Sequence, residues 1–295
     1  MHRRLQLVVN PSAGGGRAER LLPRVVSALD AAGHDLVVSP TRSLEHADEL
    51  AARGLADDRV VVAMGGDGIV GRVAGVVAGH PDGLLGVLPG GRGNDLCRAV
   101  GLPQDPVAAC AVLASGTVRR LDLGMVTSAT GTACFLGIAS TGFDSDVQER
   151  VLTSPVPLGR FVYAYGALAT VARWRPANFT AVVDGAPLVV RGWSFAVANS
   201  GVYGGGMRLA PDACLQDGLL DVVTTSQTGR LRFLLVLPRL FTGTHVRERS
   251  VAVRTAKTVV LDADRPFRVF ADGDPVGVLP CTIGVRAGAV PVLLP

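Results

Sequence analysis

The sequence is short of several residue types, and each shortage argues against a class of protein. Aromatic residues make up 5% of the 295 residues, and no basic run is interleaved with aromatics as in many nucleic-acid-binding proteins. The five cysteines are scattered, with no CxxC pair and no zinc-site spacing. We therefore expect no nucleic-acid partner, and reduced thiols in the cytoplasm are the simplest interpretation.

Long hydrophobic runs are also missing. No stretch approaches the roughly 20 apolar residues that cross a bilayer, and the nearest, FLLVLPRLF at 233–241, is short and contains an arginine. The basic N-terminus reaches Pro11 and a glycine turn too soon for a signal peptide. We expect a cytoplasmic protein whose contact with membranes, if it has one, is peripheral.

The residues that are abundant indicate a globular α/β protein. Hydrophobic residues make up 48% of the chain and charged residues 18%, and the length suits two domains. The 37 glycines cluster at turns. The net charge of +4 is compatible with anionic ligands or an anionic membrane, although an ordinary arginine-rich surface explains it equally well.

Residues 1–124 alternate between strand and helix patterns. Strands are predicted at 5–9, 34–39, 59–64 and 84–89, and helices at 17–33, 43–54, 69–79 and 105–116. Pro23 is expected in the first turn of the first helix. Strands that are apolar on both faces and separated by helices indicate a parallel sheet, here a Rossmann-like α/β domain.

The pattern changes after residue 125. Short strand-like runs separated by turn residues favour an antiparallel β-sandwich domain over 125–287. Two helical stretches, 161–174 and 229–243, interrupt it. The final strand, 288–295, could return to the first domain, and the sequence leaves that open.

Three glycine-rich turns, NPSAGGG, GGDG and GGRGND, follow predicted strands at the sheet edge where α/β proteins bind ligands. Glycine lets backbone N–H groups approach a phosphate, although a single such turn is more often only a tight turn. Asp67 in GGDG would repel a phosphate unless a cation such as Mg²⁺ lies between them. Alternatively, Asp67 caps the following helix.

Together with Thr41, RRLDLG at 119–124, the stretch 199–222 and FADGDPVG at 270–277, these turns occur in a specific order. In that order the chain resembles the diacylglycerol kinase catalytic family, the bacterial lipid kinases related to sphingosine and ceramide kinases. The resemblance covers almost the whole chain. GGDG alone also occurs in NAD kinases and phosphofructokinases, whereas GGRGNDL favours the lipid kinases.

The resemblance implies an ATP-dependent kinase that transfers the γ-phosphate to the hydroxyl of diacylglycerol or a similar lipid alcohol, in phospholipid metabolism. It assigns to the ATP site Asn10, Ser12, Gly14, Thr41, Gly65, Gly66, Asp67, Gly68, Arg72, Gly91, Arg92 and Asn94. By the same resemblance, Asp67, Asp95 and Asp122 would position Mg²⁺ through water. Asp217 would bind a structural Mg²⁺ with the carbonyls of Cys214 and Leu219, although that stretch can also be a simple turn.

The resemblance also implies a catalytic base. Asp274 matches the family's catalytic acidic residue, which is usually glutamate, and would take the proton from the lipid hydroxyl. Asp272 lies two residues earlier, so on an extended strand it would face the same way and is a second candidate.

Three residues depart from the family pattern: Ile69 replaces a threonine, Arg72 a glutamate and Arg92 a threonine. We hypothesise that Arg92, and as a second candidate Arg72, replaces the lost phosphate contacts. The simpler alternative is that both arginines point to solvent. A catalytically impaired nucleotide- or lipid-binding protein, and an NAD kinase-like enzyme, remain alternative functions.

The stretch 229–249 mixes arginines with large apolar residues. It could lie on an anionic membrane leaflet next to the lipid substrate, or simply pack on the β domain. The sequence gives no oligomeric state, and an exposed sheet edge could pair two copies as a homodimer.

Overall fold

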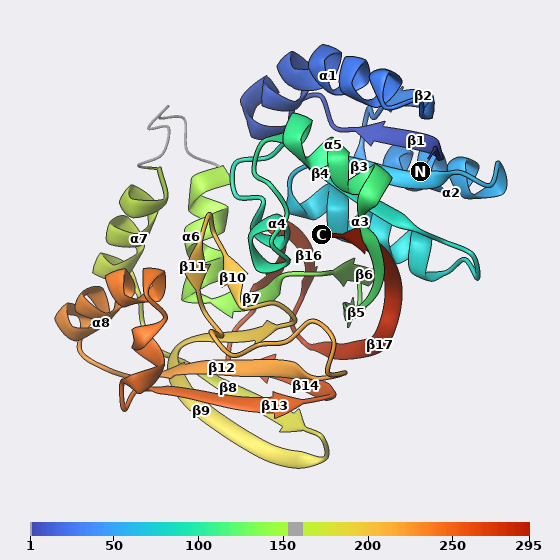
Figure 1. The fold of residues 1–295 in the computed structure, drawn as a ribbon. Helices are drawn as coiled ribbons and strands as arrows, with labels where there is room; N and C mark the ends of the chain where they lie inside the picture. Colours follow the sequence, from blue (N-terminus) through green and yellow to red (C-terminus); the bar gives the residue numbers. More distant parts are fainter. Residues whose placement is uncertain (1, 153–161) are drawn as a thin grey trace.

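The N-terminal half is a parallel sheet with helices on both faces (Figure 1). The computed structural model describes residues 2–152 and 162–295. Its first elements are β1 (Arg4–Val9), α1 (Ala13–Ala31), β2 (Asp35–Pro40), α2 (Leu44–Ala56), β3 (Val60–Gly65), α3 (Asp67–Ala78), β4 (Leu85–Pro89), α4 (Asp95–Ala99) and α5 (Pro106–Ser115). The strand order is β2-β1-β3-β4, and all three pairings are parallel.

Side chains along each strand point alternately to the two faces of the sheet, and this explains the two layers of helices. In β3, Val61 lies in the apolar cluster that α2 and α3 cover, whereas Val62 lies in the cluster that α1 and α5 cover. Successive side chains of a strand point to opposite faces, so a strand buried on both faces is apolar at every position. This is why the sheet could be predicted from continuous apolar runs.

The start of α1 differs from the prediction. Gly14, Gly15 and Gly16 lie within its bounds but have positive φ angles of 65°, 69° and 80°, so regular helix follows only from Arg17. Pro23 is then inside the helix, and the prediction that it lies in the first turn is wrong.

The C-terminal half is antiparallel. Its elements are β5 (Thr117–Ser128), β6 (Gly131–Phe135), β7 (Ile138–Gly142), α6 (Phe143–Leu152), α7 (Val162–Arg173), β8 (Ala177–Val183), β9 (Ala186–Ala198), β10 (Val202–Tyr203), β11 (Met207–Arg208), β12 (Leu220–Ser226), α8 (Arg230–Val236), η2 (Leu237–Phe241), η3 (Thr244–Arg247), β13 (Val251–Ala256), β14 (Thr258–Ala263), β15 (Arg268–Ala271), β16 (Asp274–Val278) and β17 (Cys281–Leu294). A core rich in aromatic side chains, including Phe143, Trp193 and Phe233, joins the strands to α6 and α8.

Two long strands connect the halves. β17 pairs with β14 and, along most of its length, with β5, and near its end Val292 pairs in parallel with Leu85 of β4. The C-terminus therefore lies in the N-terminal half (Figure 1). β5 runs through the predicted domain boundary at 124/125, so the two halves share strands rather than meeting at a linker. The predicted fold class, a parallel α/β domain followed by an antiparallel β-sandwich-like domain, is confirmed.

The helices of the C-terminal half differ from the prediction in two places. The sequence patterns did not indicate α6, which follows β7 directly. The predicted helix 229–243 is α8 followed by the 3₁₀ helix η2, and Pro238 at the junction explains the break because proline lacks the N–H that would continue the helix. The predicted helix 161–174 corresponds to α7, with Phe161 outside the described residues. Within residues 2–152 and 162–295, no helix is both long and apolar enough to cross a membrane.

Candidate active site

The three glycine turns pack directly against one another at the carboxyl edge of the parallel sheet. The carbonyl of Gly65 accepts hydrogen bonds from the N–H groups of Gly90 and Gly91, both at 2.8 Å. A Cβ atom on Gly14 would lie 2.7 Å from the Gly90 carbonyl oxygen, and one on Gly91 would lie 2.5 Å from Gly66 Cα. These approaches are closer than any side chain allows, so the turns require glycine.

The polar residues predicted for this edge lie at the ends of β1 and β2. The N–H of Asn10 donates to the Met64 carbonyl at 2.9 Å, which ties the end of β1 to β3. Asn10 Oδ1 accepts from Ser12 Oγ at 2.8 Å and from the Ser12 N–H at 3.1 Å. The N–H of Thr41 donates to the Val9 carbonyl at 2.7 Å. Asn10, Ser12 and Thr41 are therefore held at one rim with the glycine turns.

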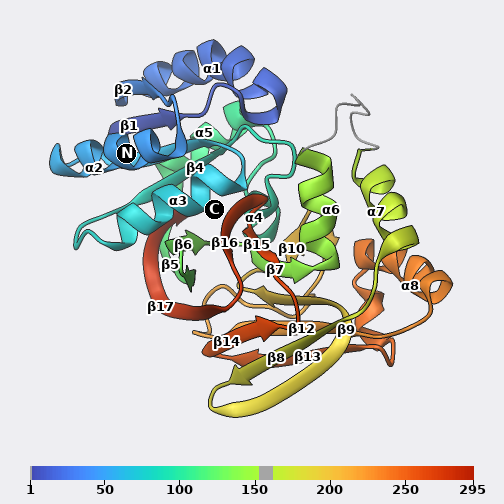
Figure 2. The same ribbon diagram turned by 180° about the vertical axis from the view of Figure 1, so that it is seen from behind.

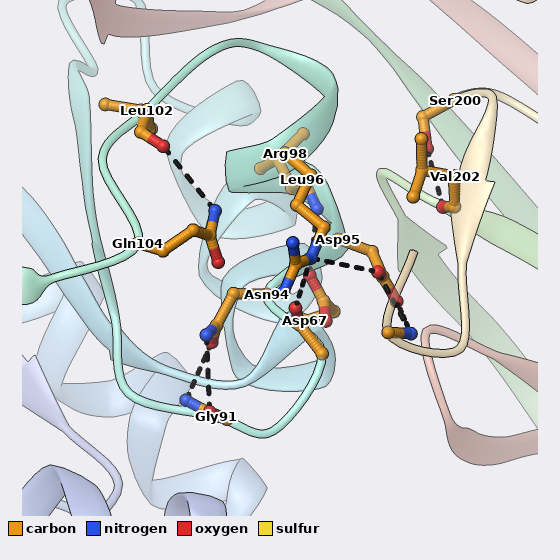
Figure 3. A network of polar contacts seen from close by, with 12 residues as sticks. Asp67, Gly91, Asn94, Asp95, Leu96, Arg98, Leu102, Gln104, Ser200 and Val202 are labelled. Atoms are coloured by element: carbon orange, nitrogen blue, oxygen red, sulfur yellow. Dashed lines mark hydrogen bonds and ion pairs between the residues drawn. The ribbon is translucent and has the colours of Figure 1, made fainter. Parts of the chain in front are cut away.

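Asp67 and Asp95 lie near each other at the third glycine turn (Figure 3), and both approach Gly93. A Cβ atom on Gly93 would be 2.9 Å from Asp95 Oδ2 and 3.3 Å from Asp67 Oδ2. Asp67 Oδ1 accepts from the Leu96 N–H at 3.0 Å, so Asp67 caps α4 and not α3, the helix that the sequence suggested. The two carboxylates form an acidic pair next to the glycine turns.

Asp95 is nearly fully buried, and both its oxygens accept from the Gly205 N–H, at 2.9 and 3.1 Å. Gly205 belongs to the loop between β10 and β11, so this contact joins the two halves of the molecule. Burial raises the pKa of Asp95, and the neighbouring charge of Asp67 adds to the rise.

Asn94 shapes the third turn (Figure 3). Its backbone is left-handed, with φ of 49°, a conformation that asparagine tolerates better than most residues. Its side chain accepts from the Gly91 N–H at 2.8 Å and donates to the Gly91 carbonyl at 3.3 Å. Asn94 thus fixes the loop, and its side chain is committed to the loop itself.

The hairpin between β15 and β16 brings two carboxylates from the C-terminal half to α3. A Cβ atom on Gly68 would collide with the carboxylate of Asp274, and one on Gly71 would lie 2.7 Å from Asp272 Oδ2. Both carboxylates therefore face α3, but Asp272 is not on an extended strand, so the reason predicted for a common direction is wrong. Asp272 and Gly273 have φ of 51° and 89° and form the hairpin turn, as Asp-Gly pairs often do.

The two carboxylates have different surroundings. Asp272 accepts from the N–H groups of Leu136, Gly137 and Ile138 at 2.9 to 3.2 Å. Burial, reinforced by the charge of Asp67, raises the pKa of Asp272 to about 7, although the three donors favour the charged form. The geometry makes Asp272 a residue that positions the hairpin.

Asp274 accepts no hydrogen bond from the residues that the structure describes. Burial raises the pKa of its carboxyl, and the positive charge of Arg72 opposes the rise. Of the two candidates for the base, Asp274 is the one whose oxygens are available.

Asp122 makes its own set of contacts. Its carboxylate is buried and accepts from the N–H groups of Gly218 and Gly288, both at 2.7 Å. No contact in the described part of the chain links it to Asp67 or Asp95. The carboxylate of Asp122 thus ties the 214–219 loop to β17, and its role in positioning Mg²⁺ through water stays a prediction.

The predicted structural Mg²⁺ site lies in that loop. Asp217 Oδ1 accepts from the Leu219 N–H at 2.9 Å, and Cys214 is exposed. Among residues 2–152 and 162–295, no three His, Cys, Asp or Glu residues are grouped so that they could hold a metal ion. A site built from Asp217 and the carbonyls of Cys214 and Leu219 therefore stays a prediction.

Two of the departures from the family pattern have structural roles. Ile69 is 3% exposed and packs in the core between the sheet, α2 and α3. Arg72 Nε lies 2.9 Å from both oxygens of Asp48 in α2, and its Nη2 lies 2.8 Å from Asp48 Oδ2. Arg72 is therefore bound by a carboxylate of α2, and the alternative that it points to solvent is wrong.

Arg92 is different. It is exposed, and its Nη2 lies 3.9 Å from the position that a Cβ atom on Gly15 would occupy. Within the described residues its side chain makes no hydrogen bond or ion pair. The guanidinium thus extends over the first glycine turn with its donors unused.

Two residues of this region were missed in the sequence. Asp144 is the second residue of α6, and burial raises the pKa of its carboxyl to about 7. Tyr203 in β10 is close enough that the charges of Asp144 and Asp95 add to the burial that raises its phenol pKa. The stretch TGFDSDV, two acids just after a buried strand, was the signal that could have indicated Asp144.

The fold and the site define a two-domain protein in which glycine turns, an acidic pair and an available carboxylate from the second domain converge. Residues 4–126 match the model of the diacylglycerol kinase catalytic domain, and residues 137–294 match that of the YegS C-terminal NAD kinase beta sandwich-like domain. The chain belongs to the diacylglycerol kinase family.

Individual relatives align with this sequence over nearly the full length of both chains. The chain is 35% identical over 292 residues to a diacylglycerol kinase of Mycobacterium tuberculosis, covering 98% of this chain and 94% of the relative. It is 26% identical over 287 residues to a diacylglycerol kinase of Bacillus subtilis, covering 94% and 92%.

A crystal structure of a diacylglycerol kinase from Bacillus anthracis superimposes with a TM-score of 0.73 at 20% identity, covering 99% of this chain and 97% of the other. A second crystal structure from that organism gives a TM-score of 0.81 at 22% identity, covering 99% and 95%. These likenesses support the fold.

Proposed function

We propose that the protein is an ATP-dependent lipid kinase that transfers the γ-phosphate to the hydroxyl of diacylglycerol or a similar lipid alcohol. One observation carries the proposal: Asp274, from the second domain, lies against Gly68, the residue that directly follows Asp67 of the acidic pair. The proposed phosphate site and the proposed proton acceptor would thereby be adjacent, as phosphoryl transfer to an alcohol requires.

The residues present fit the phosphates of ATP. The packed glycine turns bring their backbones closer together than side chains would allow, and Arg92 offers unused donors beside Gly15. Asn10, Ser12 and Thr41 lie on the same rim. ATP would supply the phosphoryl group that is transferred, and these residues would hold its phosphates in place.

The acidic pair fits Mg²⁺ next to those phosphates. Asp67 Oδ2 accepts no hydrogen bond from the described residues, and both it and Asp95 Oδ2 approach the position that a Cβ atom on Gly93 would occupy. Carboxylate oxygens and water are the ligands that Mg²⁺ prefers, and the ion would neutralise phosphate charge. Asp67 and Asp95 would hold it, directly or through water.

Asp274 would act as the general base. Its carboxylate lies at the first turn of α3, where the helix dipole stabilises a negative charge, and Arg72 in the next turn adds a positive one. Both effects favour the charged form, whereas burial opposes it, and in the charged form the oxygens can accept the proton of the acceptor hydroxyl. Asp272, bound to three N–H groups, would keep the hairpin in position.

A transfer assay tests the proposal. The full-length protein is incubated with γ-labelled ATP, Mg²⁺ and separate acceptors: diacylglycerol, other lipid alcohols, and NAD. The proposal expects label in the organic phase with one or more lipids and none in NAD. Label in NAD alone would favour an NAD kinase-like enzyme.

A second candidate is a nucleotide- or lipid-binding protein with impaired catalysis. It is favoured by the burial of Ile69 and by the binding of Arg72 to Asp48, which leave this turn of α3 without the hydroxyl and the acid of the family pattern. In the same assay, ATP binding without transfer to any acceptor would support this candidate.

A further inference from the structure

Helix α8 and the turn η2 expose large apolar side chains. Leu231 is 73% exposed, Leu235 64% and Phe241 61%. Leu231 and Leu235 are four residues apart, so they lie on one face of α8. We call Leu231, Leu235 and Phe241 the apolar ridge. In Figures 1 and 2, α7 lies beside α8 on the same side of the molecule, and its Leu168 is 60% exposed.

The ridge is not needed to hold α8 in place, because the opposite face of the helix does that. Phe233 is buried, stacks on Trp193 with ring centroids 4.0 Å apart, and meets Phe143 edge-on at 4.9 Å. Val236 is buried as well. A helix anchored on one face ordinarily has polar residues on the other, so adjacent exposed leucines on the free face indicate an interaction surface.

The charges around the ridge identify the kind of partner. Segments 162–175 and 229–250 contain seven arginines and one acidic residue, Glu248, whereas the whole chain has 29 basic and 25 acidic residues. Glu248 binds Arg232 and Arg239, which leaves a positive excess. Arg173, Arg175, Arg247 and Arg249 are all exposed. Exposed apolar side chains on segments rich in exposed arginines match an anionic lipid surface.

We propose that the apolar ridge is the surface by which the protein binds anionic membranes, with its leucines and Phe241 inserted between lipids and the surrounding arginines at the headgroups. The inference rests on the proposed function, because an enzyme whose acceptor is a lipid must bind the bilayer that contains it. The ridge is also connected to the base. Phe233 packs on Phe143 at the start of α6, α6 follows β7, and β7 pairs with β15, whose hairpin carries Asp274.

The test measures vesicle binding and catalysis separately. The full chain, the double variant Leu231→Asn/Leu235→Asn and the control Val189→Asn are sedimented with phosphatidylcholine vesicles, with or without phosphatidylglycerol. Val189 is 72% exposed, but it lies in β9 and outside the ridge. The inference expects wild type and control to bind anionic vesicles in a salt-sensitive way, and the double variant to bind at least about tenfold more weakly.

Activity distinguishes the inference from the proposed function. The double variant should lose activity on vesicle-borne diacylglycerol and keep it on dispersed short-chain diacylglycerol. If the double variant binds vesicles more weakly than wild type but neither protein phosphorylates any acceptor, the membrane-binding role of the apolar ridge is supported and the kinase proposal fails. Equal vesicle binding by the double variant and wild type would overturn the inference. So would a dimer that the same substitutions dissociate, without vesicle binding, because the ridge would then bind a second copy.

Discussion

The carboxylate of Asp274 lies against Gly68 in the first turn of α3, so closely that no Cβ atom fits between them. The two residues come from different domains and are 206 positions apart in the chain. Because Gly68 directly follows Asp67, this contact determines how near the carboxylate from the second domain comes to the acidic pair. A residue as small as glycine at position 68 is therefore part of the geometry of the site.

Gly68→Ala is expected to abolish most of the transfer activity while preserving the fold. The new methyl group meets the end of a side chain, which can move, and alanine favours helix over glycine by about 1 kcal/mol. The carboxylate must move away from α3, and the base is displaced. We expect an unchanged or higher melting temperature and a kcat reduced by about tenfold or more.

The matched control for this substitution is Gly284→Ala, where the nearest atom to an added Cβ is 3.7 Å away. It should leave kcat unchanged. If Gly68→Ala proves as active as wild type at the same stability, the contact with Asp274 has no catalytic importance.

Arg72 is expected to set the pH at which activity appears. A base must be deprotonated, so the rate rises as pH increases through the pKa of Asp274. Arg72 lowers that pKa, whereas burial raises it. Arg72→Met should therefore shift the acid limb of the pH–rate profile to higher pH. The other charges facing this hairpin and this turn of α3, Asp67, Asp272 and Glu45, are unchanged in the variant.

Asp48→Asn provides the opposite change. It removes the carboxylate that neutralises Arg72, so the arginine's charge acts more strongly on Asp274 and the acid limb should shift to lower pH. Profiles of kcat/KM for wild type and both variants give the comparison. Shifts in the same direction for the two variants would mean that Arg72 acts through the packing of α2 and not through its charge.

Arg92→Thr, which restores the residue usual in the family, is expected to weaken nucleotide binding. A hydrogen bond to a charged group contributes about 1.5–3 kcal/mol, so the ATP dissociation constant should rise about tenfold or more. Arg53→Thr, an exposed arginine of α2, serves as the control. Titration calorimetry that finds the same affinity for both variants would show that Arg92 makes no phosphate contact.

Asp217→Ala tests the predicted structural Mg²⁺ site. If the ion binds there, Mg²⁺ raises the melting temperature of wild type, because a ligand that binds only the folded state stabilises it. The variant should lose that part of the rise, whereas the exposed control Asp82→Ala should retain it. If Mg²⁺ raised the melting temperature of all three proteins equally, Asp217 would not bind a structural Mg²⁺.

Local patterns in the sequence determine much of this structure. The sheet follows from runs such as 59–64, because a strand buried on both faces must be apolar throughout. The Asp-Gly pair at 272–273 is typical of a hairpin turn, and in hindsight it predicts that Asp272 leaves the strand. The helix break at Pro238 could also be predicted from the sequence, because proline lacks the N–H that would continue the helix.

Contacts between residues far apart in the chain could not be predicted from local sequence patterns. Asp48 is 24 residues from Arg72 and Gly205 is 110 residues from Asp95, and no local period links them. The partners of Asp122, Gly218 and Gly288, are 96 and 166 residues away from it in the chain. These contacts arise from tertiary packing, within the N-terminal domain for Asp48 and Arg72 and between the domains for Asp95 and Gly205, so only the three-dimensional structure reveals them.

The most direct measurement is phosphoryl transfer by Asp274→Asn. Asparagine keeps the shape of the side chain but cannot take a proton, and general-base catalysis contributes about 10²–10⁴-fold to a rate. With γ-labelled ATP and dispersed diacylglycerol, kcat should fall within that range while ATP affinity and melting temperature stay as in wild type. A variant that transfers phosphate at the wild-type rate would show that Asp274 is not the base.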